Sequence, residues 1–164
     1  MIRFAFALAL AAPLAACATA SAQTDALHPE ARPYAEDADA GAAVDAALAR
    51  AAARGTNVLL IMGANWCHDS RALAGWLDTP RFRELTDWRY EVVFVDAGTP
   101  QQDKGRNLDI ARRFGIEQLH GTPNLFVIRP DGSLANPDSV TGWRNAASRE
   151  EDAIYAELES LAGS

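Results

Sequence analysis

The chain of 164 residues is long enough for one domain of ordinary size, and a division into two domains would leave each half with a marginal core. Hydrophobic residues make up 49% and charged residues 23%, which is typical of a globular protein and excludes a fibrous or wholly disordered one. The formal net charge is -7, and no run of Lys or Arg is present that could neutralise a phosphate backbone. The sequence therefore argues against a nucleic-acid-binding protein.

The N-terminal residues have the pattern of an export signal. Arg3 precedes an apolar run, residues 4–12, that is too short to span a bilayer. Residues 14–17 (Leu-Ala-Ala-Cys) resemble the lipobox of bacterial lipoproteins, whereas residues 20–22 (Ala-Ser-Ala) suit ordinary signal peptidase. We favour the lipobox, which predicts a signal peptide over residues 1–16 and a membrane-anchored, periplasmic lipoprotein whose lipid is carried on Cys17. Ordinary cleavage would give a soluble periplasmic protein.

The next segment, residues 17–40, is Ala-rich and acidic and shows no apolar periodicity, which predicts a flexible tether. The folded domain is expected over residues 41–164. Apolar periodicity and turn residues predict its elements. In chain order they are a helix ending at Gly55, a strand over 57–62, a helix over 67–77, a helix over 80–85 with Thr79 as N-cap, a strand over 90–95, a loop over 98–106, a helix over 107–114, a strand over 123–128, a short return strand around Ser133, and a last helix opened by a capping box of Ser148 and Glu151.

Helices alternate with the first strands in this order, and a hairpin follows near the end. Helical connections demand right-handed parallel crossovers, and the hairpin adds an antiparallel edge. The sequence therefore predicts an α/β fold with a mixed central sheet and helices on both of its faces. The aromatic residues on apolar faces are predicted to be core, and Trp143 to be packed at an element boundary. The predicted core aromatics are Trp76, Phe82, Trp88 and Phe114.

Cys67 is the one free thiol that either cleavage leaves, in a compartment where structural disulfides are normal. It opens the predicted helix over 67–77, which follows the predicted strand over 57–62, and this places its sulfur at a helix N-terminus. Unpaired backbone N–H groups and the positive end of the helix dipole stabilise a thiolate there. Cys67 is therefore a candidate nucleophile, and the alternative is a buried cysteine that acts only as a small hydrophobic residue.

Two short motifs resemble the thioredoxin superfamily. Residues 64–67 (Ala-Asn-Trp-Cys) are similar to the Ala-x-Trp-Cys that opens the superfamily's active site, and residues 114–116 and 121–123 (Gly-Thr-Pro) are similar to the stretch that leads into its cis-proline. The resemblance covers about residues 41–162 and is strongest to thioredoxin-like domains of bacterial periplasmic disulfide-reducing systems. It implies a thioredoxin-like fold with Cys67 as the nucleophile. It also implies that an extended substrate segment binds beside the sulfur, at Trp66, Thr122 and Pro123.

The sequence departs from the superfamily at the position of the second cysteine, which is Ser70 here. An internal thiol therefore cannot expel a partner bound to Cys67 as a mixed disulfide. The superfamily's buried aspartate is also absent, and Ile61 stands at its position. Ser70 is either a catalytic partner whose hydroxyl donates a hydrogen bond to the Cys67 thiolate or a solvated helix residue. His68 and Asp69 lie between Cys67 and Ser70. An imidazolium at His68 would lower the pKa of the Cys67 thiol, and a carboxylate at Asp69 would raise it.

A metal site is a further class that the sequence permits. Cys67, His68, Asp69 and His120 carry suitable ligand atoms, but neighbouring helix residues point about 100° apart and no paired ligand motif is present. We therefore predict no metal site and no cofactor. His28 lies in the predicted tether and is expected to be solvated.

The sequence thus predicts a periplasm-facing monothiol protein that acts in thiol–disulfide exchange through Cys67, with a thiol- or disulfide-containing protein or a glutathione-like thiol as partner. Without a resolving cysteine this chemistry suits isomerisation or thiol capping better than net reduction. The alternative is a binding module that keeps the peptide groove of the fold without redox chemistry. A metal-handling protein is a third, minor hypothesis.

Overall fold

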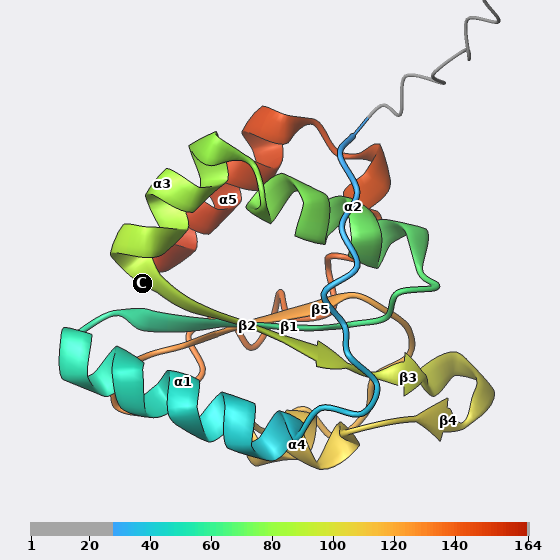
Figure 1. The fold of residues 1–164 in the computed structure, drawn as a ribbon. Coiled ribbons are helices and arrows are strands. Elements are labelled where there is room, and N and C mark those ends of the chain that lie inside the picture. The colour runs from blue at the N-terminus through green and yellow to red at the C-terminus, as the bar shows by residue number, and fades with distance from the viewer. Residues whose placement is uncertain (1–27, 164) are drawn as a thin grey trace, which may run out of the picture.

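The computed structural model describes residues 28–163, so the predicted signal peptide and Cys17 lie outside the described residues. Five α-helices, two short 3-10 helices and five strands follow one another in this range (Figure 1). They are α1 (Ala40–Arg54), β1 (Asn57–Gly63), α2 (His68–Leu77), α3 (Pro80–Arg89), β2 (Tyr90–Asp96), β3 (Gly98–Thr99), η1 (Pro100–Gln102), β4 (Lys104–Gly105), α4 (Leu108–Arg113), β5 (Asn124–Ile128), η2 (Ala146–Ser148) and α5 (Glu151–Ala162).

The central sheet has three strands in the order β2-β1-β5, and β1 pairs in parallel with β2 and antiparallel with β5. All seven residues of β1 are buried, as expected for a continuous apolar run in a strand covered on both faces. Helices α1 and α4 lie on one side of the sheet and α2, α3 and α5 on the other (Figure 1). The predicted α/β architecture with a mixed sheet is therefore confirmed.

The two faces of β1 contribute to two separate cores, because successive side chains of a strand point in opposite directions. Leu60 and Met62 pack in the core that contains α1, whereas Leu59 and Ile61 pack in the core that contains α2, α3 and α5. The Ile61 position is therefore an ordinary core position here, since its apolar side chain is fully buried among other apolar groups.

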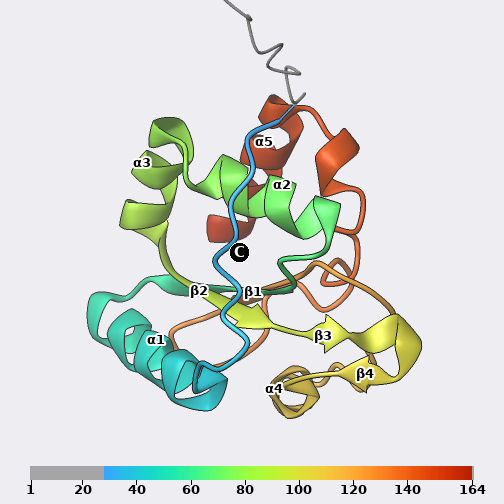
Figure 2. The same ribbon diagram turned by 45° about the vertical axis from the view of Figure 1, so that its right-hand side comes forward.

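The N-terminal segment, defined here as residues 28–39, runs across α2 and down to the start of α1 (Figures 1 and 2). Tyr34 is fully buried, with its ring edge-on to Phe94 at a centroid distance of 5.5 Å. A Cβ added at Gly75 of α2 would lie 2.3 Å from the Pro29 carbonyl oxygen, so the segment packs directly on the helix backbone. The prediction of a flexible tether is wrong for these residues, because their apolar contacts come from distant parts of the chain. The prediction that His28 is solvated is wrong too, since its side chain is buried.

Several local predictions differ from the structure. The loop over 98–106 holds the small hairpin of β3 and β4, and the return strand around Ser133 is reduced to one bridge between Ile128 and Leu134. The capping box is not formed, because the Ser148 hydroxyl donates to the Asn145 carbonyl within η2 and α5 begins after Glu150. Helix α3 also continues to Arg89, four residues beyond the predicted end.

Among the aromatic residues, Phe82 and Trp143 are fully buried, as predicted. Trp88 is predicted in the core and is instead 77% exposed on α3. The helical pattern places it on an apolar face, but α3 uses Phe82 and Leu85 for its contact with the core. Trp88 is therefore a surface residue of this domain.

Candidate active site

Cys67 is the N-cap residue of α2 and follows the loop that leaves β1. Its backbone is extended, its N–H donates to the Ala64 carbonyl oxygen at 3.0 Å, and its carbonyl accepts from Arg71 N–H. The side chain is 8% exposed, and its sulfur donates to the Thr122 carbonyl oxygen at 3.3 Å. The thiol therefore sits where the sequence places it, at the N-terminus of a ten-residue helix, and it is largely buried there.

The second motif lies against the first. The peptide bond between Thr122 and Pro123 is cis, and β5 starts directly after it at Asn124. The Asn124 side-chain amide donates to the Gly121 carbonyl at 2.7 Å and so braces the turn that precedes the strand. The fold thus brings Thr122 and Cys67, 55 positions apart, into direct contact, as the resemblance implies.

Trp66 provides an exposed aromatic surface next to the thiol. Its side chain is 51% exposed, although its indole N–H donates to the Gly98 carbonyl oxygen at 3.1 Å. That hydrogen bond fixes the ring over the loop that carries β3, rather than burying it. Aromatic side chains held in this way combine an apolar face with a fixed orientation, which suits contact with a partner.

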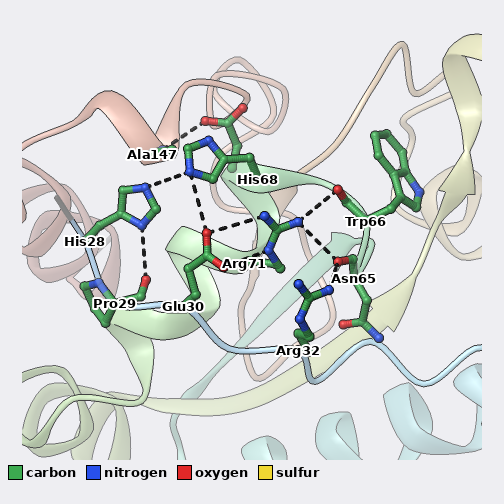
Figure 3. A network of polar contacts seen from close by, with 10 residues as sticks. His28, Pro29, Glu30, Arg32, Asn65, Trp66, His68, Arg71 and Ala147 are labelled. Carbon is green, nitrogen blue, oxygen red and sulfur yellow. Dashed lines mark hydrogen bonds and ion pairs between the residues drawn. The ribbon is translucent and has the colours of Figure 1, made fainter. Parts of the chain in front are cut away.

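Two arginines hold the loop that precedes Cys67. Arg32 of the N-terminal segment donates to the Asn65 carbonyl at 2.7 Å, and Arg71 of α2 donates to the Trp66 carbonyl at 2.9 Å (Figure 3). Asn65 in turn exchanges hydrogen bonds with the backbone of Tyr34 through its side-chain amide. The N-terminal segment is therefore part of the scaffold of the site.

Ser70, the residue at the position of the superfamily's second cysteine, is fully buried. Its hydroxyl has no hydrogen-bond partner within residues 28–163, so neither predicted role is found. The hydrogen bond to Cys67 is not formed, since the sulfur donates to the Thr122 carbonyl instead, and Ser70 is not solvated, since none of its surface is exposed.

Tyr34 is a site residue that the sequence reasoning missed. Its hydroxyl donates to the Ser70 carbonyl oxygen at 3.1 Å. A Cβ at Gly63 would lie 2.5 Å from its ring, so only glycine fits at the end of β1. Burial raises the pKa of Tyr34 above its ordinary range, and a negative charge on nearby Cys67 acts in the same direction. The side chain is therefore a neutral donor below the active-site helix. A large aromatic residue in an otherwise small and acidic segment is the signal that the sequence offers for it.

His68 and Asp69 make their hydrogen bonds and ion pairs away from the thiol. The Asp69 carboxylate accepts from the Ala147 N–H at 2.9 Å and so ties α2 to η2. His68 faces the N-terminal segment, where its Nε2 lies 3.0 Å from His28 Nε2 and 3.6 Å from Glu30 Oε1 (Figure 3). The suggested effect of these two side chains on Cys67 therefore has no direct geometric support.

The four metal-ligand candidates from the sequence do not converge. Within the described part of the chain, the group of potential ligands that does come together is His28, Glu30 and His68. Only His68 belongs to both sets. Within residues 28–163, moreover, no helix has the length and apolar character needed to cross a membrane.

Similarity to known proteins identifies the family of this chain. The model of a family described as thioredoxin-like matches residues 39–130. A solved structure, a disulphide isomerase from Xylella fastidiosa Temecula1, superposes with a TM-score of 0.71 at 32% sequence identity, over 80% of this chain and 97% of that chain. No curated protein matches. Because the family match covers more than half of the chain and the structural match agrees with it, the chain belongs to the thioredoxin-like family.

Proposed function

We propose that this protein carries out thiol–disulfide exchange with one nucleophilic thiol, that of Cys67. The observation that carries the proposal is the position of the sulfur, at the N-terminus of α2 and 3.3 Å from the Thr122 carbonyl oxygen. A thiolate is stabilised at such a helix end. Similarity to a disulphide isomerase at 32% identity supports the same class of reaction.

The proposed reaction is an exchange of one disulfide for another. The Cys67 thiolate attacks one sulfur of a partner's disulfide, so that a bond forms between Cys67 and that sulfur while the partner's S–S bond breaks. The second partner sulfur leaves as a thiolate and takes a proton from solvent. No net electrons are transferred in this step, because one disulfide and one thiol are present before and after it.

Release must come from a thiol outside this site, since Ser70 stands where a resolving cysteine would be. When the displaced second cysteine of the partner attacks the mixed disulfide, the original disulfide re-forms, whereas attack by a different cysteine of the partner gives a new disulfide, which is isomerisation. When a small thiol of the glutathione kind attacks, the small thiol takes over the bond to the partner or to Cys67.

Substrate binding is proposed beside the sulfur. Thr122 and Pro123 at the start of β5 would receive an extended segment of the partner, and the exposed Trp66 ring would contact its side chains. These contacts would also serve the alternative function, a peptide-binding module without redox chemistry, which is favoured by the half-exposed Trp66 together with the missing second cysteine.

Trapping of mixed disulfides distinguishes the two functions. The full chain is incubated with periplasmic extract, free thiols are alkylated, and adducts are separated without reductant and mapped by peptide mass spectrometry. Exchange predicts partners bound through Cys67 and their absence with Cys67→Ser. A wild-type chain that forms no adduct through Cys67 would contradict exchange, whereas adducts that persist in Cys67→Ser can involve only Cys17. Non-covalent pull-down with Cys67→Ala that depends on Trp66 would then identify the binding module.

We also propose that the protein is exported and anchored by a lipid on Cys17, which supports a periplasmic site of action. The proposal depends on the lipobox at residues 14–17. Mass spectrometry of the mature N-terminus should find a diacylglycerol-modified Cys17. A mature chain that begins at Gln23 would contradict the anchor, although it would remain compatible with export.

A further inference from the structure

Two histidines and a glutamate meet on the surface where the N-terminal segment crosses the start of α2. His28 and Glu30 come from the segment and His68 from the first residue of the helix (Figure 3). The Nε2 atoms of the histidines are 3.0 Å apart, Glu30 Oε1 is 3.6 Å from His68 Nε2, and one ligand atom from each residue lies within 4.8 Å of the others. The cluster is separate from the hydrogen bond of the Cys67 sulfur, which goes to Thr122.

Two hydrogen-bond acceptors face one histidine nitrogen in this cluster. His28 Nδ1 lies 3.2 Å from the Pro29 carbonyl oxygen, which can only accept, so Nδ1 carries a proton. In the neutral ring, His28 Nε2 then presents a lone pair toward His68. His68 Nε2 thus faces two acceptors, that lone pair and the Glu30 carboxylate. A single N–H cannot point at both, whereas a cation between the three atoms satisfies all of them.

The Glu30 carboxylate is oriented by Arg71, which donates from Nε to Glu30 Oε2 at 2.9 Å. The second oxygen, Oε1, is the one that faces His68 and lies 3.4 Å from Arg71 Nη2. Hydrogen bonds to the far side of a metal-binding carboxylate, and from a ligand histidine to a backbone carbonyl, are typical of the outer shell of metal sites.

We propose that His28, Glu30 and His68 bind a divalent transition-metal ion of the zinc class, with water in the remaining position. Zinc takes histidine nitrogens at about 2.0–2.1 Å and carboxylate oxygens at about 2.0–2.2 Å, so two ligand atoms around one ion lie roughly 3.0–3.6 Å apart. The separations of 3.0 Å between the two histidine nitrogens and 3.6 Å between His68 and Glu30 fit this spacing. Two neutral imidazoles and one carboxylate also form a donor set that zinc uses.

The site would fasten the N-terminal segment to α2 one residue after the nucleophile. The same segment supplies Arg32 to the active-site loop and Tyr34 to the underside of α2. An ion that bound only the folded arrangement would therefore stabilise the scaffold of the active site, by an amount that grows with its concentration. This role is independent of whether Cys67 exchanges disulfides.

Calorimetric titration of the full chain with Zn²⁺ tests the proposal. His120, the third histidine of the chain, is exposed outside the cluster and provides the matched control. We expect one Zn²⁺ per chain, binding weakened by about tenfold or more in His28→Ala and in Glu30→Gln, and binding unchanged in His120→Ala. Binding should also persist when Cys17 and Cys67 are both replaced by Ala.

A melting experiment on the same variants checks that the loss is local. Zn²⁺ should raise the Tm of the wild-type chain and of His120→Ala but not that of Glu30→Gln, an isosteric change that keeps the segment intact. Absence of stoichiometric binding, loss of binding on removal of the two thiols, or full binding in both His28→Ala and Glu30→Gln would overturn the site. If His28→Ala does not fold, Glu30→Gln alone decides.

Discussion

The sulfur of Cys67 donates to the backbone carbonyl oxygen of Thr122 at 3.3 Å. This contact joins the helix N-terminus after β1 to the turn before β5, so the nucleophile lies at the point where a partner backbone would have to pass in order to pair with the Thr122 region. Under the proposed function, a partner segment bound there would have its disulfide next to Cys67. The contact therefore places the proposed binding surface and the proposed nucleophile at one location.

Trp66 tests whether the surface beside the thiol binds partners. We expect Trp66→Ala to slow exchange with a peptide disulfide by about tenfold, since removing an aromatic side chain from a binding surface costs on the order of 1–2 kcal/mol. Exchange with glutathione disulfide should change little, because so small a partner covers little of the ring. The measurement is the second-order rate of mixed-disulfide formation for each partner.

Trp88 offers the control for that experiment, because it is a tryptophan with a still more exposed side chain, on α3 and away from Cys67. Trp88→Ala should leave both rates unchanged. A peptide-specific loss in Trp88→Ala equal to that in Trp66→Ala would show that general surface hydrophobicity, rather than the position of Trp66, is responsible.

Ser70 tests the proposed monothiol chemistry. We expect Ser70→Cys to allow an intramolecular disulfide between positions 67 and 70, because the family places its second thiol at this position, one turn along α2. Mixed disulfides with partners should then become short-lived, and the oxidised chain should resist alkylation at Cys67.

Ser70→Ala, which removes only a hydroxyl that has no partner within residues 28–163, should show neither change. Peptide mapping without reductant measures both, and a Ser70→Cys chain that keeps long-lived partner adducts would contradict this interpretation.

Tyr34 couples stability to alkaline pH. Burial raises the pKa of Tyr34 and that of Tyr90, which donates to the Leu158 carbonyl at 2.6 Å. Their stabilisation is complete below the unfolded pKa of about 10, and it is lost as pH rises toward the folded pKa, because the unfolded chain then releases protons that the native chain keeps. Each residue should contribute about 1.4 kcal/mol of lost stability per pH unit in that window.

Urea unfolding between pH 9 and about 11.5 measures this slope. Tyr34→Phe should reduce the alkaline slope of the unfolding free energy by about half, and Tyr90→Phe should do the same. At neutral pH, Tyr34→Phe should cost about 1 kcal/mol because the hydrogen bond to the Ser70 carbonyl is removed. An alkaline slope identical in wild type and both variants would refute the assignment.

Much of the fold follows from local sequence patterns. The apolar run over 57–62 is buried on both faces, and the predicted helix over 67–77 is found as α2, which begins at His68 with Cys67 as its N-cap. The thioredoxin-like motifs identify Cys67 and Thr122 as neighbours, although only the folded chain brings them together. These features depend on periodicity or on short motifs, which a single sequence displays directly.

The surroundings of the site could not be predicted in this way. Tyr34, His28 and Glu30 meet α2 across about 40 positions of sequence, from a segment with no periodicity of its own. Ser70 is fully buried and its carbonyl accepts a hydrogen bond from Tyr34 of the same segment, so part of its environment depends on the same long-range contact. Long-range packing of an irregular segment leaves no local pattern, which is why the segment resembles a tether when the sequence is considered alone.

The most direct test of Cys67 as a nucleophile is the reaction of the folded full chain with glutathione disulfide at neutral pH, followed by intact-mass and peptide mass spectrometry. We expect one glutathione adduct on Cys67 that dithiothreitol removes, and no adduct within residues 28–163 of Cys67→Ser. A Cys67 that stays unmodified in the folded chain and reacts only after denaturation would contradict the proposed exchange, because the thiol would then be a buried packing group rather than a nucleophile.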